Sequence, residues 1–313
     1  MQVQIRAVGI CGTDLHAFHG DQPFFSYPRI LGHELAVEIV AIGPTSQPHD
    51  FSIGNICAIN PYLNCGQCIS CRRGRPNCCV QMRVLGVHID GGMREIINVP
   101  LAKLHKAVGL PDSSVAITEM LAVTAHAVDR TAIEPDENVL VIGAGPIGIG
   151  VISFVKAAGA NPIVAEVSEF RQQFCRSVLG IEHLVDPKAD MVEQLKTMLD
   201  GDLPTVVMDA TGSARSMQNS LSYMAHSGKL TFVGLVQGET MFNDSLMHAK
   251  ETTLLRTRNA LDKDFQRVLA MLESGAIDPA PWITHHTDPD HIVAEFSGWL
   301  NPANNVIKAV LEF

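Results

Sequence analysis

Five cysteines fall within fifteen positions of the sequence, in the stretch CGQCISCRRGRPNCC at 65–79. Four of them have the spacing C-x2-C-x2-C-x7-C, namely Cys65, Cys68, Cys71 and Cys79. Four thiolates complete a tetrahedral zinc site and leave no position open to a substrate. We therefore expect a zinc ion that holds this loop in shape, while the fifth cysteine, Cys78, is not needed.

Other interpretations of this loop are weaker. An iron–sulfur cluster also takes four cysteines, but the bacterial run ends in C-x3-C-P and this one does not. A redox loop needs only two thiols, and unliganded buried cysteines would not be surrounded by Gly, Gln, Asn and Arg. A zinc ribbon that binds nucleic acid has support in Arg72, Arg73 and Arg75. In a protein with a net charge of -10, these arginines are better explained as a solvated loop face.

A second set of candidate ligands lies in the segments GICGTDLHAF and LGHELAVEIV. A catalytic zinc takes about three protein ligands and keeps one open position. Cys11, His33 and an acidic residue would supply such a set. Taken singly, Cys11 could be a small core residue and His33 a histidine of a capped turn. The neighbouring glycines, which let the backbone close around an ion, favour the metal site.

A glycine-rich turn follows an apolar run in VLVIGAGPIGIG and has the pattern G-x-G-x-x-G. Between a strand and a helix, the first glycine permits a tight turn and the second lets a pyrophosphate approach the backbone. The third lets the helix pack on the strand, and the helix N-terminus faces the anion. The sequence therefore predicts a dinucleotide site at this turn, with the contact residues Gly143, Gly145, Pro146, Ile147 and Gly148.

The next expected strand, PIVAEV, carries Glu166 about 20 residues after Gly145. A carboxylate at this position accepts hydrogen bonds from the ribose hydroxyls of NAD and would repel the 2′-phosphate of NADP. The alternative for Glu166 is a solvated acid at a strand end. We expect NAD rather than NADP, although Arg171 leaves some tolerance for NADP.

The elements that must position these residues differ along the chain. Up to about residue 110, short strand-like runs with period-two alternation, such as 2–8, 34–43 and 55–60, predict a β-rich region. Beyond it, expected helices alternate with strands and predict an α/β, doubly wound parallel sheet. The helices are expected at 113–132, 146–160, 173–180 and 214–228, and the strands at 138–145, 162–167, 205–212 and 229–235. A helix over 263–277 and a strand over 304–313 close the chain.

Composition limits the possible partners. At 313 residues, with 46% hydrophobic and 18% charged residues, the chain is expected to form about two globular domains. The net charge of -10 gives no electrostatic attraction to nucleic acid or to an anionic membrane surface. The apolar run 139–155 is broken by glycines and proline and is shorter than the ~20 residues that span a bilayer. The N-terminus lacks a secretory signal pattern, so we expect a cytoplasmic protein.

Taken together, these residues resemble the zinc-dependent medium-chain alcohol and polyol dehydrogenase family over essentially the whole chain. The matches are GICGTDLH, GHE, the four-cysteine loop and GAGPIG, in the family's order. FFSYPRILGHE and IKAVLEF are most similar to the sugar-acid and polyol branch. The resemblance implies hydride transfer between a secondary alcohol of a polyol or sugar acid and NAD, with two zinc ions per chain, in a homodimer or homotetramer.

The resemblance also implies a domain organisation. A GroES-like catalytic domain would consist of residues 1–119 with 257–313, and a Rossmann domain of residues 120–256. Members of the family have roughly 25 more residues before the strand at Gln2, and the loss of a neighbouring strand would expose unpaired backbone. A non-catalytic protein that binds zinc and nucleotide, disabled by this missing segment, is the alternative; a quinone reductase of the same broad fold would lack both zinc sets.

By the same resemblance, Cys11, His33 and Glu34 lie at catalytic zinc positions, and Glu119 aligns with an acidic residue that ligates the zinc or a zinc-bound water. The neighbouring side chains of His33 and Glu34 would point to opposite faces of an extended segment, so both reach one ion only if the backbone turns there. We therefore treat Glu34 and Glu119 as competing ligands, one of which would lie outside the ligand set or exchange as substrate enters. The family usually has proline where this chain has Met120.

Further site residues follow from this resemblance. Thr13 would relay the substrate proton, His16 would carry it to solvent, and Asp14 would orient His33. An aromatic group, Phe24, Phe25 and Tyr27, would line the substrate cleft or belong to the core.

Overall fold

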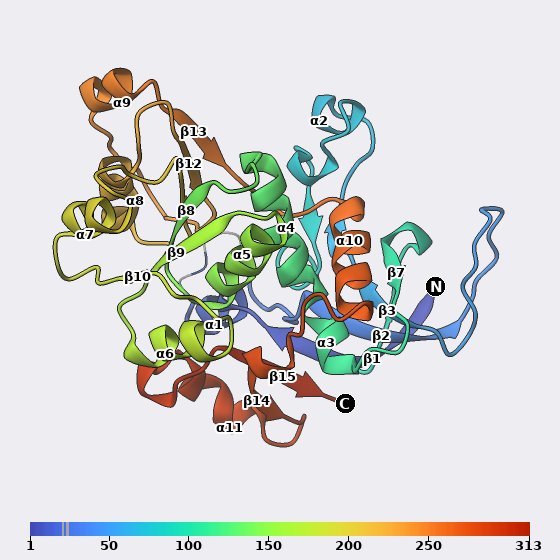
Figure 1. Ribbon diagram of the computed structural model, residues 1–313. Helices are drawn as coiled ribbons and strands as arrows, with labels where there is room; N and C mark the ends of the chain where they lie inside the picture. The colour runs from blue at the N-terminus through green and yellow to red at the C-terminus, as the bar shows by residue number, and fades with distance from the viewer. Residues whose placement is uncertain (21, 23–24) are drawn as a thin grey trace. The chain divides into compact units, whose positions relative to one another are not determined.

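The structure, a computed structural model, describes residues 1–20, 22 and 25–313. The chain forms two compact units (Figure 1). The first unit consists of Met1–Ala122 with Asn259–Phe313, and the second unit of Val123–Arg258. The sequence predicts domain boundaries near residues 119 and 257, and these boundaries stay predictions.

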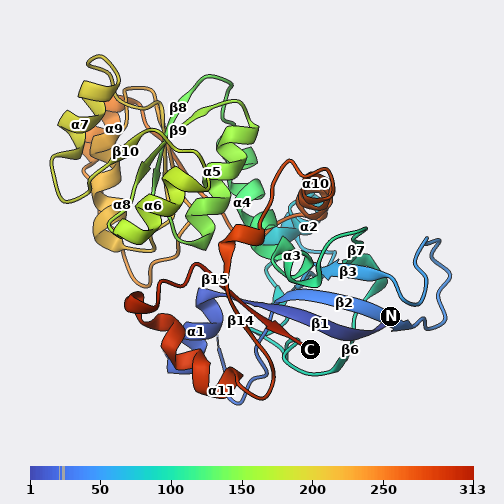
Figure 2. The ribbon, with the colours of Figure 1, turned by 60° about the horizontal axis from the view of Figure 1, so that its bottom comes forward.

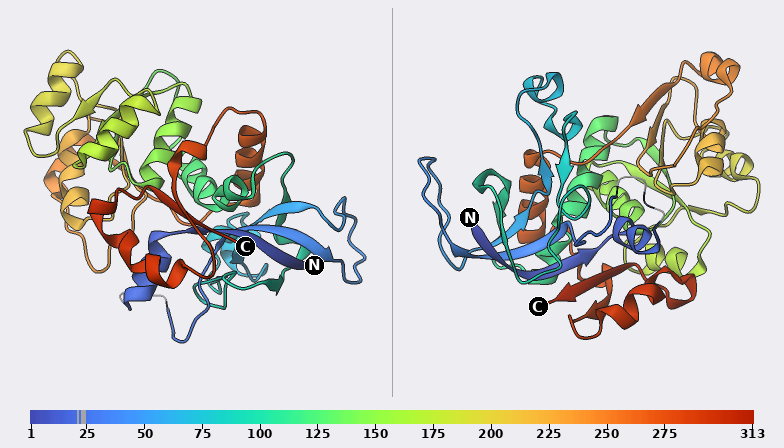
Figure 3. Two further views of the ribbon diagram at one scale, coloured as in Figure 1. Left: turned by 90° about the horizontal axis from the view of Figure 1, so that it is seen from below. Right: turned by 180° about the vertical axis from the view of Figure 1, so that it is seen from behind.

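A seven-stranded sheet forms the centre of the first unit, with the order β14-β15-β1-β2-β3-β7 and with β6 also paired to β1. Its strands are β1 (Gln2–Ile10), β2 (Glu34–Ala41), β3 (Ile56–Ile59), β6 (Ile96–Asn98), β7 (Leu104–Lys106), β14 (Ile283–Thr287) and β15 (Lys308–Glu312). β1 runs antiparallel to β2, β15 and β6, so it has partners on both sides (Figure 3). The buried side chains of Val3 and Ile5 alternate with the exposed Gln2 and Gln4, as the period-two pattern predicts.

This antiparallel arrangement places three chain segments at one end of β1. The end of β1 lies beside the starts of β2 and β15, because both of these strands run opposite to it. Residues that follow β1, begin β2 or begin β15 are therefore neighbours, although they are far apart in the sequence.

The remaining elements of the first unit are short. Its helices are α1 (Gly12–His19), α2 (Ile69–Arg72), α3 (Asp112–Ala116), α10 (Asp262–Glu273) and α11 (Ile292–Glu295), with α4 (Thr118–Thr131) beginning in this unit. The strands β4 (Tyr62–Leu63) and β5 (Arg83–Val84) pair antiparallel on either side of the four-cysteine segment 65–79, which we call the cysteine lobe. Single 3-10 turns lie at Pro76–Cys78, Leu101–Lys103, Ala280–Trp282, Phe296–Leu300 and Pro302–Asn304.

A parallel six-stranded sheet forms the second unit, in the order β10-β9-β8-β11-β12-β13. Its strands are β8 (Asn138–Ile142), β9 (Asn161–Ala165), β10 (Leu184–Val185), β11 (Val206–Asp209), β12 (Lys229–Phe232) and β13 (Thr253–Arg256). Its helices are α5 (Pro146–Ala157), α6 (Glu169–Ser177), α7 (Met191–Met198), α8 (Ala214–Ser220) and α9 (Asp244–Lys250), and a 3-10 turn lies at Leu221–Tyr223. Figures 1 and 2 show α5 on one side of this sheet and α7 and α8 on the other. The predicted α/β, doubly wound parallel sheet is confirmed.

Several local predictions differ from the structure. The helix expected at 113–132 is divided into α3 and α4 at Ile117, and the helix expected at 214–228 ends as α8 at Ser220. The short helices α1, α7 and α9 were not predicted. The side chain of Asp190 accepts hydrogen bonds from two amides at the start of α7, and the side chain of Asn243 accepts one from the amide of Leu246 at the start of α9. These caps start helices too short for a hydrophobic period to reveal.

Within the described residues, no helix has the length and apolar character that crossing a bilayer requires.

Candidate active site and metal centres

The four predicted cysteines of the cysteine lobe come together. The sulfur atoms of Cys65, Cys68, Cys71 and Cys79 all lie within 4.8 Å of one another. Cys68 Sγ is 3.5 Å from Cys71 Sγ, and Cys79 Sγ is 3.5 Å from Cys65 Sγ. These separations are close to the ~3.8 Å that a tetrahedron with zinc–sulfur bonds of about 2.3 Å requires. Cys78 is exposed and is not a member of this group.

Backbone amides of the lobe favour ionised sulfur. Hydrogen bonds from the backbone of Cys71 and then Val80 lower the pKa of the Cys68 thiol to about 6. The amides of Cys65 and Gln81 donate to Cys79 Sγ over 3.3 and 3.4 Å. Loss of solvent raises the pKa of Cys71 to about 11, so this thiol needs a cation beside it to ionise. The thiolate is the form that binds metal, and the lobe therefore fits a zinc ion.

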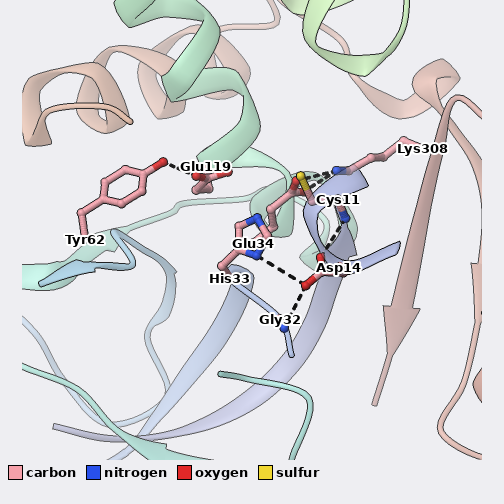
Figure 4. A network of polar contacts seen from close by, with 8 residues as sticks. All are labelled: Cys11, Asp14, Gly32, His33, Glu34, Tyr62, Glu119 and Lys308. Carbon is pink, nitrogen blue, oxygen red and sulfur yellow. Dashed lines mark hydrogen bonds and ion pairs between the residues drawn. The ribbon is translucent and has the colours of Figure 1, made fainter. Parts of the chain in front are cut away.

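A second potential metal centre forms at the end of β1. Cys11 directly follows β1 and precedes α1, His33 directly precedes β2, and Glu34 is the first residue of β2. One ligand atom from each of these three residues lies within 4.8 Å of the other two (Figure 4). His33 is 5% exposed and Glu34 is fully buried. The set of one sulfur, one nitrogen and one oxygen donor is of the kind that catalytic zinc uses.

The donor atoms of this centre differ in the partners they already have. His33 Nδ1 lies 3.5 Å from Asp14 Oδ1, so the other ring nitrogen is the one available to an ion. Both carboxylate oxygens of Glu34 lie beside Lys308 Nζ, so an ion bound by Glu34 would share this carboxylate with the lysine.

Asp14 supports this centre from α1. Its fully buried carboxylate accepts hydrogen bonds from the amides of Cys11, over 2.9 Å, and Gly32, over 3.2 Å. Burial alone would raise the pKa of Asp14, but the charge of His33 and these hydrogen bonds hold it below its ordinary value. Burial likewise opposes the charged form of His33, yet Asp14 raises the pKa of His33 well above its ordinary value. Asp14 therefore lies where it can orient His33.

Lys308, which the sequence did not single out, is the buried counterion of Glu34. Lys308 Nζ lies 2.6 Å from Oε1 and 2.5 Å from Oε2 of Glu34, and the lysine side chain is only 2% exposed. Burial disfavours a charged lysine, but the negative charges of Glu34 and Cys11 raise the pKa of Lys308. The one available signal was a lysine in the otherwise apolar run VIKAVL.

Glu119, at the start of α4, is 6% exposed and is not grouped with the three candidate ligands among the residues described. Its carboxylate accepts a hydrogen bond from the hydroxyl of Tyr62. Burial is the main reason that the pKa of Glu119 is raised; the charge of Glu34 adds to this and the charge of His33 opposes it. Sequence analysis also missed Tyr62, because nothing local marks it as a partner of α4.

The two residues predicted to carry the substrate proton, Thr13 and His16, both lie on α1. Thr13 is partly buried on α1 and His16 on the same helix is exposed, so their roles stay predictions. Phe24 lies outside the described residues. Tyr27 is 56% exposed and donates a hydrogen bond to the carbonyl of Ala17 over 2.5 Å, and its ring lies 6.1 Å from that of Phe25.

The glycine turn of the second unit has the geometry that its sequence predicts. Gly143 has a φ of 89°, which side chains rarely adopt. A Cβ at Gly148 would lie less than 3.0 Å from the carbonyl oxygen of Gly143. Gly145 is the N-cap of α5, with Pro146 and Ile147 in its first turn, so free amides face the turn. The turn can therefore approach a pyrophosphate closely.

Glu166 lies next to this turn at the end of β9. It is 4% exposed, so the alternative of a solvated acid is wrong. Its carboxylate accepts hydrogen bonds from the amides of Ala144, over 2.6 Å, and Ser168, over 2.8 Å. The guanidinium of Arg171 lies near Gly145, with Nη1 3.7 Å from where a Cβ of this glycine would be. Both predicted ribose-side residues thus flank the turn.

The absence of a side chain at Gly9 makes room for Glu34. The two residues are paired across β1 and β2, and a Cβ at position 9 would lie less than 3.0 Å from Glu34 Oε2. We expect Gly9→Ala to lower the free energy of unfolding by about 1–3 kcal/mol, as overpacking does, and to reduce zinc binding at this centre. Gly43→Ala, with open space around the new Cβ, is the control. Equal zinc content in both variants, measured by elemental analysis, would contradict this expectation.

Comparison with known proteins identifies two family models. The model described as "Alcohol dehydrogenase GroES-like domain" matches residues 1–112, and "Zinc-binding dehydrogenase" matches residues 146–274. The L-galactonate-5-dehydrogenase of Escherichia coli strain K12 is 42% identical over 312 residues, which are 99% of this chain and 91% of that protein.

Two solved structures show the same fold. A putative zinc-binding dehydrogenase from Sinorhizobium meliloti, bound to NADP, has a TM-score of 0.91 and 28% identity, and the match covers 100% of this chain and 92% of that one. The L-idonate 5-dehydrogenase of Escherichia coli has a TM-score of 0.89 and 26% identity, covering 100% and 90%.

Proposed function

The chain belongs to the zinc-dependent medium-chain alcohol dehydrogenase family, and from this premise we propose that it oxidises a secondary alcohol of a sugar acid or polyol with NAD. Family membership makes it an oxidoreductase that acts on CH–OH groups. The observation that carries the proposal is the convergence of Cys11, His33 and Glu34 on one point in the first unit. L-galactonate is the first substrate to test, because a relative of 42% identity is named for it.

In this proposal, Cys11, His33 and Glu34 hold the catalytic zinc. The bound ion would polarise the substrate hydroxyl and lower its pKa, so that an alkoxide can form at neutral pH. Cys11 and Glu34 supply two negative charges that offset those of the ion, and Lys308, paired with Glu34, adds one positive charge to the centre. Asp14 keeps the imidazole of His33 in orientation through Nδ1.

The proton of the substrate hydroxyl needs a path to solvent. We assign its first step to Oγ1 of Thr13 and its transfer to solvent to His16, both on α1. Support for this path comes from the family resemblance and from the exposure of His16, which is in reach of water.

NAD is the proposed hydride acceptor. Two backbone hydrogen bonds fix the carboxylate of Glu166 beside the glycine turn, where it can accept hydrogen bonds from ribose hydroxyls and repel a 2′-phosphate. Arg171, near Gly145, is the residue that would tolerate NADP.

A second, structural zinc is proposed for the cysteine lobe, so the expected content is two zinc ions per chain. Thiolate ligands require a reducing compartment, and we propose the cytoplasm. A homodimer or homotetramer is proposed from the family resemblance, and sedimentation would measure it.

The proposal is tested with the purified protein, NAD or NADP, and a panel that contains L-galactonate, L-idonate and simple polyols. We expect absorbance at 340 nm to grow with at least one sugar acid or polyol, faster with NAD than with NADP, and two zinc ions per chain by elemental analysis. No growth with any substrate in a protein that holds two zinc ions would overturn the dehydrogenase function. One zinc, confined to the cysteine lobe, would favour the non-catalytic alternative.

A further inference from the structure

We propose that Tyr62 is a positioning residue that holds Glu119 away from the catalytic ion and so keeps one coordination position open for the substrate. The inference rests on the proposed function, because it requires a metal at Cys11, His33 and Glu34. It concerns a residue outside the candidate ligand set and addresses the competition between Glu34 and Glu119.

The contact itself is buried and direct. Tyr62 is 4% exposed and Glu119 is 6% exposed. Figure 4 shows the Tyr62 hydroxyl pointing to the Glu119 carboxylate, whose Oε1 atom accepts its hydrogen bond. Among the described residues, this is the hydrogen-bond donor that the structure gives to the Glu119 side chain.

Glu119 would otherwise compete for the ion. The charges of His33, Glu34 and Lys308 all act on the Glu119 carboxylate, so it lies within the electrostatic range of the centre. Lys308 is already paired with Glu34 and does not offer Glu119 a matching hydrogen bond. A buried carboxylate without a donor is costly, and a bound divalent cation would be the strongest partner available. Removing the tyrosine hydroxyl therefore releases Glu119 toward the metal.

If Glu119 moved toward the metal, Tyr62 would not move with it, because other contacts hold Tyr62 in place. The amide of Tyr62 donates to Asn60 Oδ1 over 3.0 Å, and Asn60 Nδ2 donates to Asp262 Oδ1 over 2.6 Å. The ring of Phe265, on the same helix as Asp262, packs edge-on against the Tyr62 ring with centroids 6.3 Å apart. α10 thus holds the residue from one side.

The other side of Tyr62 leads into the cysteine lobe. Tyr62 pairs with Val84 across β4 and β5, and Cys65 follows three residues later. The Tyr62 hydroxyl therefore belongs to the strand β4 that leads into the cysteine lobe, and a zinc ion in the lobe would restrict the motion of this strand.

The test uses protein in which cobalt replaces zinc, since the visible absorption of cobalt reports its ligands. The spectrum of the Cys11→Ser variant is subtracted to remove the contribution of the cysteine lobe. Imidazole, which binds at an open metal position, is the probe. We expect imidazole to bind the Tyr62→Phe protein about 10-fold or more weakly than the unmodified protein, the change that one hydrogen bond to a charged group accounts for.

Two further variants separate positioning from a general effect. Tyr62→Phe combined with Glu119→Gln should recover the imidazole response, because the neutral amide is a poor competitor for the ion. Tyr223→Phe, which removes a tyrosine hydroxyl in the second unit, should leave the response unchanged. An unchanged imidazole affinity in Tyr62→Phe would overturn the inference while leaving the proposed function intact. Cobalt confined to the cysteine lobe in the unmodified protein would overturn both.

Discussion

Replacing Cys11 with serine will lower kcat/KM for the oxidation of the sugar acid or polyol by about 1,000-fold or more. A bound metal ion contributes several kcal/mol of charge stabilisation in the transition state, and each ~1.4 kcal/mol is a factor of ten in rate. A serine hydroxyl does not ionise near neutral pH, so the variant loses both the thiolate ligand and one of the two negative charges that offset the ion. His33 and Glu34 alone would hold the zinc weakly.

This expectation is checked by initial rates at 340 nm together with zinc content. The content should fall from two ions to one per chain, because the cysteine lobe does not involve Cys11. Cys78→Ser is the matched control, since Cys78 is exposed and outside both ligand groups. If Cys11→Ser keeps the rate of the control variant, Cys11 is not a ligand of the catalytic ion.

The parts of the site that sequence could predict are those encoded within a short segment. The four cysteines lie within fifteen positions, so their spacing alone predicts a metal-binding loop. The glycine turn is equally local, because its strand, turn and helix follow one another in the chain. In the same way, the alternation of helices and strands after residue 110 predicted the strands β8, β9, β11 and β12, although it did not predict the edge strands β10 and β13.

The parts that sequence could not predict depend on strand pairing. Lys308 and Glu34 are 274 residues apart in the sequence. They form an ion pair because β2 and β15 both run antiparallel to β1, which places the starts of these two strands side by side. Tyr62 reaches Glu119 only because α4 starts beside β4. No periodicity in either segment shows which distant residue will be opposite, so only the folded sheet identifies these partners.

The predicted competition between Glu34 and Glu119 illustrates the same point. From the sequence, both carboxylates were equal candidates. The structure separates them by their neighbours. Glu34 lies with Cys11 and His33 and is paired with Lys308, whereas Glu119 is outside that group among the described residues and accepts a hydrogen bond from the Tyr62 hydroxyl. The ligand assignment stays a prediction, and the reason to favour Glu34 is structural.

Removing one partner of the buried Glu34–Lys308 pair should destabilise the metal-free first unit strongly. We expect Lys308→Met, which keeps most of the side-chain volume, to lower the free energy of unfolding by about 3–5 kcal/mol, because it leaves Glu34 buried without a counterion. Zinc at this centre would supply positive charge in place of the lysine. The destabilisation should therefore be smaller in the zinc-loaded variant than in the variant depleted by a chelator.

Tryptophan fluorescence can measure this effect in the unit concerned, because the chain has two tryptophans, Trp282 and Trp299, and both are buried in the first unit. Unfolding in urea would be followed with and without zinc. Arg6→Met is the control in the same unit, since the 3.3 Å pair of Arg6 with Asp112 is partly exposed and such pairs contribute at most about 1 kcal/mol. Combining Lys308→Met with Glu34→Gln should restore much of the loss, because the remaining group is uncharged. If the single variant unfolds like the control, with or without zinc, then Lys308 is not the counterion that lets a carboxylate remain ionised in this core.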